Sequence, residues 1–134
     1  MKGAQNTAIG TAALLNNTTG SFNMATGTFA LFSKTTGEGN TATRGNALYS
    51  NTTGSSNTAN GFSALDFNTT GSFNTAAGTA ALGLNTVGSR NTATGFQALS
   101  LNSTANDNTA YGYQALLYNS SGGGQNTAVG SERS

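Results

Sequence analysis

The sequence predicts an all-β solenoid, a rod built from stacked coils of 17 residues each. The triplet Asn-Thr-Ala returns at a fixed spacing, the same small and apolar residues return inside every unit, and turn-forming residues separate them. Such a unit is too short for a helix pair, whose repeats need roughly 33 residues or more. Stacking short units buries a continuous core that a single unit cannot form, so the repeat itself predicts the architecture.

The Asn of the triplet marks position 1 of each coil. Coils 1 to 8 begin at Asn6, Asn23, Asn40, Asn57, Asn74, Asn91, Asn108 and Asn126. The spacing is 17 residues except between the last two, where it is 18 because of an extra residue in the run Gly122-Gly123-Gly124. We therefore expect a single repeat domain over residues 1–134, with seven coils over 6–125 and a partial eighth over 126–134.

Several positions hardly vary between coils. Position 3 is Ala in all eight copies, and positions 8 and 9 are Ala-Leu in the seven complete ones. Position 5 is Gly except at Arg44, where we expect Gly45 to take over the turn, and position 15 is Gly except at Ala105. In a stacked coil, the Leu residues form an internal ladder, and positions 3 and 8 stay Ala because a thin coil has no room for more.

Two short strands are expected in each coil, at positions 2–6 and 7–11. A Gly corner at position 5 and the segment Asn-Thr-Thr-Gly-Ser separate them, since Asn, Gly and Ser favour turn geometries. Parallel strand spacing then places like residues about 4.8 Å apart and gives a rod on the order of 35 Å long.

Stacking also predicts specific side-chain contacts. Asn at positions 1 and 12 would lie above Asn, where amides can hydrogen-bond along the stack; a simple turn-forming role explains these residues equally well, and the two are compatible. Arg90 and Asp107 both occupy position 17 in consecutive coils, so we expect an ion pair between them. This pair tests the register.

An apolar stripe is the candidate contact surface. Position 10 is apolar in the first three coils (Leu15, Phe32, Tyr49), whereas from coil 4 position 11 is apolar (Phe67, Leu84, Leu101, Tyr118). The stripe therefore changes face near residue 66, or the backbone bulges there. Each coil buries only one Leu and two Ala, and this burial offsets little of the conformational entropy lost when the chain is ordered. We therefore favour contact between chains, over simple interior packing, as the role of the stripe.

Composition excludes most chemistry. The chain has no Cys and no His and a net charge of +1, so it offers no thiolate, no imidazole base and no usual zinc ligand set. We therefore expect no enzyme, no catalytic, cofactor or metal site, and no nucleic-acid partner. The four acids and five bases are too few and too scattered for a calcium cage or a phosphate-binding stripe: Glu38, Asp66, Asp107 and Glu132; Lys2, Lys34, Arg44, Arg90 and Arg133.

Membrane and targeting signals are also not expected in this segment. The sequence contains no stretch of about 18 apolar residues, the length that a membrane-spanning helix needs. Polar and small residues follow Met1 where a signal peptide would have its apolar region, so either that segment was removed or the chain is a fragment.

The repeats resemble a known family. The run Gly71-Ser72-Phe73-Asn74-Thr75-Ala76-Ala77-Gly78, continuing to Ala81-Leu82, is similar to head-domain repeats of trimeric autotransporter adhesins. It is still more similar to repeats of bacterial and phage fibre proteins that often end in an endosialidase-type intramolecular chaperone. The resemblance covers residues 5–130 and implies a left-handed parallel β-roll, a homotrimer of intertwined chains, and an extracellular, cell-surface role in adhesion or as a fibre shaft.

The resemblance leaves the ligand open, so a host or cell-surface protein or a glycan is the expected partner class. One alternative is a subunit that polymerises end to end into an extracellular filament. Another is ice binding by a Thr-rich face, which needs Thr at positions 2 and 4 of successive coils. Only coils 3 and 6 have both, which disfavours this function.

Four further features have a functional and a structural interpretation. Tyr111, Tyr113 and Tyr118 could stack on sugars or pack against a neighbouring subunit. The cluster Lys34, Glu38 and Arg44 is a contact patch or, as we favour, a solvated surface, and the Gly122–Gly124 run is a loop. Glycosylation sequons begin at Asn16, Asn17, Asn51, Asn68, Asn102 and Asn119, where a structural role at or beside position 12 is favoured.

Overall fold

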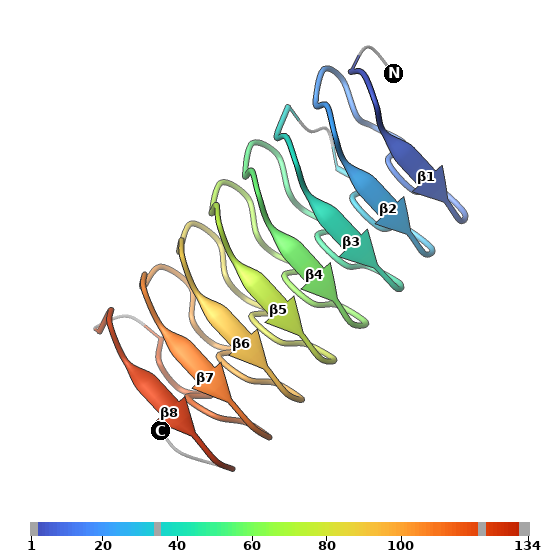
Figure 1. Cartoon of the computed structure of the whole chain (residues 1–134). Coiled ribbons are helices and arrows are strands. Elements are labelled where there is room, and N and C mark those ends of the chain that lie inside the picture. Colours follow the sequence, from blue (N-terminus) through green and yellow to red (C-terminus); the bar gives the residue numbers. More distant parts are fainter. Residues whose placement is uncertain (1–2, 34–35, 121–122, 132–134) are drawn as a thin grey trace.

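The computed structural model describes residues 3–33, 36–120 and 123–131, which form a parallel β-solenoid without helix. Each coil contributes one strand of three residues to a single sheet, and the strands follow one another in chain order (Figure 1). The strands are β1 (Thr7–Ile9), β2 (Met24–Thr26), β3 (Thr41–Thr43), β4 (Thr58–Asn60), β5 (Thr75–Ala77), β6 (Thr92–Thr94), β7 (Thr109–Tyr111) and β8 (Thr127–Val129). The all-β solenoid is confirmed.

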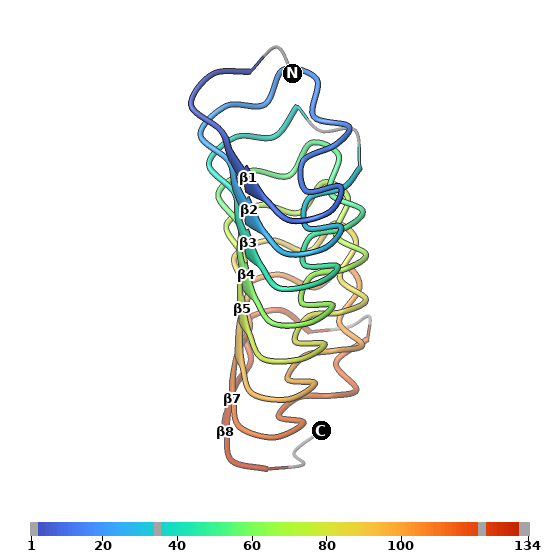
Figure 2. The same ribbon diagram turned by 90° about the vertical axis from the view of Figure 1, so that its right-hand side faces the viewer.

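Strand pairing follows the sequence repeat. Ala59 pairs with Ala76, 17 residues on, and the same offset holds at every junction up to β7. Between β7 and β8 the offset is 18, with Ala110 opposite Ala128, so the additional residue lies outside the strands. The sheet forms one wall of the rod and the turns form the opposite wall (Figure 2).

The second expected strand is wrong: positions 7–11 form a series of tight turns. In most coils, amides at positions 8, 10 and 12 donate to the carbonyl three residues earlier, as those of Ala81, Gly83 and Asn85 do at 3.1–3.2 Å. The amides between them, of Leu82 and Leu84, donate instead to carbonyls of the next coil, each at 2.9 Å. Along this segment, backbone amides therefore donate alternately to a carbonyl of their own coil and to a carbonyl of the next coil.

Backbone conformation explains why no strand forms there. Position 9 has a positive φ in every complete coil, between 49° at Leu31 and 53° at Leu48, and position 7 does the same, as at Ala80 with a φ of 56°. A strand needs extended residues throughout. This left-handed conformation costs L-residues roughly 1–2 kcal/mol each, and the dense hydrogen bonding around these residues holds it in place.

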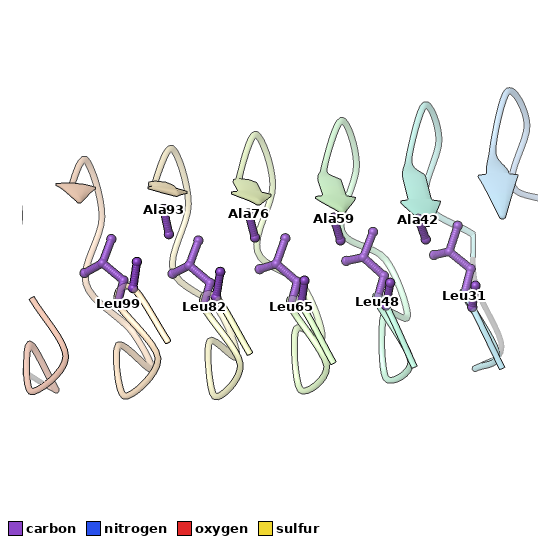
Figure 3. Close-up of a cluster of buried hydrophobic side chains, with 14 of the residues drawn as sticks. Leu31, Ala42, Leu48, Ala59, Leu65, Ala76, Leu82, Ala93 and Leu99 are labelled. Carbon is purple, nitrogen blue, oxygen red and sulfur yellow. The ribbon is translucent and has the colours of Figure 1, made fainter. Parts of the chain in front are cut away.

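The interior is a column of Leu flanked by Ala, as expected (Figure 3). Leu31, Leu48, Leu65, Leu82 and Leu99 have no exposed surface, and neither do the Ala residues at positions 3 and 8 of coils 3 to 6. Burial weakens at both ends, where Ala8 is exposed and Leu116 is half-buried. Each coil covers the next.

The corner at position 5 uses positive φ in most coils, with values of 123° at Gly10 and 139° at Gly27. In coil 3, Arg44 itself adopts this conformation, at 83°, while Gly45 has no positive φ. The expectation that Gly45 takes over the turn is therefore wrong. An added Cβ on Gly27 would approach the Arg44 carbonyl carbon to 2.5 Å, so close stacking restricts this position as well.

Candidate binding surface

The Asn residues at position 1 form the predicted ladder. The side-chain Nδ2 of Asn40 donates to Oδ1 of Asn23 at 3.1 Å and to the carbonyl of Gly54 at 2.9 Å. The backbone amide of Asn40 also donates to Oδ1 of Asn23, at 2.9 Å. These Asn side chains are buried, so one amide links adjacent coils and also bridges its own coil to a carbonyl 14 residues later, which confirms the ladder.

A second Asn ladder runs along position 12. Nδ2 of Asn68 donates to Oδ1 of Asn51 at 2.8 Å and to the carbonyl of Gly71 at 2.9 Å. Asn17 Oδ1 is buried and has no hydrogen-bond partner within the described part of the chain. The next residue at this position is Lys34, which lies outside the described residues together with Thr35.

The hydrogen bonds at position 12 give most of the sequon Asn residues a structural role. The side chains at Asn17, Asn51, Asn68 and Asn102 are buried, and each Nδ2 donates to a carbonyl within its own turn. Asn119 is half-buried, whereas Asn16 is exposed. In the folded chain, these buried amides are therefore used for structural hydrogen bonds and are closed to an enzyme from solvent.

The predicted ion pair between Arg90 and Asp107 is present. Nε of Arg90 donates to Oδ1 of Asp107 at 2.6 Å, and Nη2 donates to Oδ2 at 2.8 Å. This bidentate geometry lowers the pKa of Asp107 and raises the pKa of Arg90. The pair lies on the surface, where it reports the register.

The backbone does not bulge near residue 66, which leaves the other expectation, that the apolar residues change position on the surface there. The amide of Ser50 donates to the carbonyl of Asp66 at 2.9 Å, and that of Phe67 donates to Gly83 at 3.0 Å, the same pattern as in neighbouring coils. The switch from position 10 to position 11 is therefore a change of side chains on an unchanged backbone.

We call the apolar side chains at these positions the apolar row. It consists of Leu15, Phe32, Tyr49, Phe67, Leu84, Leu101, Leu117 and Tyr118. Each complete coil contributes at least one member, and none is fully buried; Phe67, for example, is 52% exposed. The row therefore remains open to water along the whole series of coils.

Aromatic residues cluster at the N-terminal part of the row. Phe32 and Tyr49 stack with ring centroids 5.0 Å apart, and Phe29 meets both edge to face. Phe29, at position 7, was not among the residues predicted to form the stripe. The signal was its spacing from Phe32, because positions 7 and 10 lie on one side of the turn series.

Asp66 also went unnoticed as a candidate site residue. It is half-buried at position 10, and the Ser63 side chain, at position 7, hydrogen-bonds to it. Burial raises the pKa of Asp66 because the carboxylate loses water, and the Ser63 hydrogen bond opposes this in part. A carboxyl beside apolar neighbours is thus built into the stripe.

The three C-terminal tyrosines are exposed but differ in their surroundings. Tyr111 is in β7, Tyr113 follows the position-5 corner, and Tyr118 belongs to the apolar row. Tyr113 stacks on Phe96, with centroids 5.3 Å apart and an angle of 13° between the rings. One face of Tyr113 is therefore already covered.

The remaining candidates show no assembled site. Glu38 and Arg44 are exposed, and the described residues contain one ion pair, the one between Arg90 and Asp107. The described chain holds no group of three possible metal-ligating acids, and none of its segments is a helix able to cross a membrane. An open hollow of about 400 Å³ lies between residues 104–107 and 123–125, next to the undescribed residues 121–122.

Gly123 and Gly124 form loop structure, as expected for the Gly-rich run, whereas Gly122 lies outside the described residues. The Gly123 carbonyl accepts from Nδ2 of Asn119, as the position-15 carbonyl of other coils accepts from position 12, and also from Nδ2 of Asn126 in the next coil. Comparison with protein-family models, curated proteins and solved structures gave no match.

Proposed function

We propose that this chain is a structural and adhesive segment of an extracellular fibre in which three identical copies assemble side by side. The sequence resemblance to trimeric adhesin heads and fibre shafts motivates the trimer, its left-handed coil and its location. The physical support is a rod whose coils repeat the same contacts, so that a lengthening stack stays stiff. The rod would hold a polar, repeated surface away from the cell for attachment to a host or cell-surface protein or glycan.

The apolar row is the observation that carries this proposal. Each coil has a small interior, yet it leaves at least one large apolar side chain partly in water, and these side chains lie in consecutive coils. Contiguous exposed apolar surface is typical of contact sites. Parallel copies related by a rotation axis would bring the same row of each copy to that axis.

Solution mass tests the proposal. Sedimentation equilibrium should give three times the chain mass of 13.3 kDa. Replacing Phe67 and Leu84 by Ser, the residue at position 11 in coils 2 and 3, should yield monomer. Val87→Thr is the matched control, since it removes an exposed apolar residue outside the row and restores the usual residue at position 14; it should remain trimeric. A monodisperse monomer of the wild type would reject the proposal.

End-to-end polymerisation is the second candidate, and one observation favours it. Within this 134-residue chain, β1 and β8 are the outer strands of the sheet, and each pairs with a strand on one side. Unpaired strand edges are templates for further strands. Electron microscopy at rising concentration would show growing filaments in this case, whereas the trimer predicts rods of fixed length.

A further inference from the structure

Asp66 is the one charged residue among positions 10 and 11 of the seven complete coils. Its neighbours along the stack are Tyr49 at the same position of coil 3 and Gly83 in coil 5, and the apolar Phe67 follows it in the chain. It is half-buried even in the single chain. Because Asp66 follows Tyr49 at position 10 of the stack, a partner that covers Tyr49 and Phe32 also meets this carboxyl.

Within the described part of the chain, no positively charged side chain pairs with Asp66. Ser63 supplies a hydrogen bond within coil 4, Tyr49 is the titratable neighbour on coil 3, and Gly83 of coil 5 has no side chain. Among the described residues, Arg90 is paired with Asp107 at position 17, away from this stripe. Further loss of water would act on an unneutralised carboxylate, which is costly.

We propose that Asp66 makes assembly of the rods acid-dependent, with the copies associating through the apolar row while this carboxyl is protonated and separating more readily when it ionises. The inference rests on the proposed trimer. In a closed, parallel assembly, a residue close to the symmetry axis meets its own equivalents from the other copies. Ionised Asp66 side chains would then repel one another in a site poor in water, whereas protonated ones donate hydrogen bonds.

The direction of the effect follows from linkage. Burial already raises the pKa of Asp66 above its ordinary 3.8, and assembly would raise it further. The assembled state then binds more protons than the free chains, so association is strongest at low pH and weakens as pH rises through the pKa in the assembly. Each unit of additional shift corresponds to about a tenfold change in association per copy.

Sedimentation equilibrium from about pH 4 to about pH 8, a range that spans a raised carboxyl pKa, tests this on the wild type and two variants. Asp66→Asn removes the charge with the least change of shape, and Asp66→Ser introduces the residue that Ser100 provides at the same position of coil 6. Asp107→Asn is the matched control, because it removes an exposed carboxylate outside the row. Circular dichroism at each pH establishes that every variant is folded.

The wild type and the Asp107→Asn control should both associate more weakly as pH rises. The Asp66 variants should associate with little pH dependence and more tightly than wild type at the high end. A wild-type trimer whose association is independent of pH overturns this inference and leaves the proposed trimer standing, as does an unchanged pH dependence in Asp66→Asn. Monomer at every pH overturns both.

Discussion

The side-chain amide of Asn68 donates to Oδ1 of Asn51, 17 residues earlier, over 2.8 Å and away from water. The same Nδ2 also donates to the carbonyl of Gly71, so one side chain fixes both the vertical spacing of the coils and the turn within its own coil. This double use explains why Asn recurs at position 12, since its amide offers two N–H donors and an acceptor oxygen, whereas a Thr hydroxyl of similar size has a single donor hydrogen.

Asn68→Ala should lower the free energy of unfolding by about 1–3 kcal/mol, because it leaves the buried Oδ1 of Asn51 and the carbonyl of Gly71 without this donor. Urea denaturation measures the change. Asn16→Ala, at an exposed position in coil 1, is the control and should alter stability little. Equal losses in the two variants would mean that the ladder does not stabilise the stack.

Lys34→Asn should stabilise the protein by about 1 kcal/mol. By sequence, residue 34 is position 12 of coil 2, and Asn there would supply the donor that Oδ1 of Asn17 lacks among the described residues. Lys34→Ser removes the charge without supplying an amide and separates the two effects. The prediction fails if the melting temperature rises equally in both variants.

Leu65→Ala should cost about 2–5 kcal/mol, since this side chain is fully buried in a column that has no other large residue in its coil. Val87→Ala removes an exposed apolar side chain and serves as the comparison in the same denaturation experiment. A small effect at Leu65 would show that the Leu column is not the core.

Asp107→Asn should remove a pH-dependent part of the stability. The ion pair lowers the pKa of Asp107 below its ordinary 3.8 in the folded chain, so its contribution is present above that value and is lost as pH falls through the lowered pKa. Thermal unfolding at decreasing pH should show a steeper loss in the wild type than in Asp107→Asn. High salt should reduce the difference at neutral pH because the pair is exposed. Parallel pH curves would mean that the pair contributes nothing.

Most of the stacking could be predicted because a strict repeat converts one-dimensional spacing into three-dimensional contact. Once the offset is 17, the Leu column, both Asn ladders and the contact between Arg90 and Asp107 follow from it. The second strand was mispredicted because Leu82 and Ala80 carry no turn signal of their own. Their left-handed conformations are imposed by bonding to adjacent coils, which no single coil reveals.

The conformation of Arg44 and the burial of Asp66 could not be predicted from the sequence either. Arg44 keeps the conformation of the Gly it replaces, since the coils on either side fix the backbone there. In the sequence, Asp66 is only a polar residue that interrupts an apolar stripe. Its half-buried state depends on the turn geometry, which places Ser63 beside it.

Engineered disulfides test the vertical stacking most directly, because the chain has no native Cys. Thr58 and Thr75 are paired residues of adjacent strands, so their Cα atoms should be about 4.8 Å apart, within the range that a disulfide bridges. Thr58→Cys combined with Thr75→Cys should close an intrachain disulfide on mild oxidation, detected by mass spectrometry. Thr58→Cys combined with Thr92→Cys, two coils apart, should stay reduced within the chain; intrachain closure of the distant pair, or failure of the adjacent pair, would contradict the stacked solenoid.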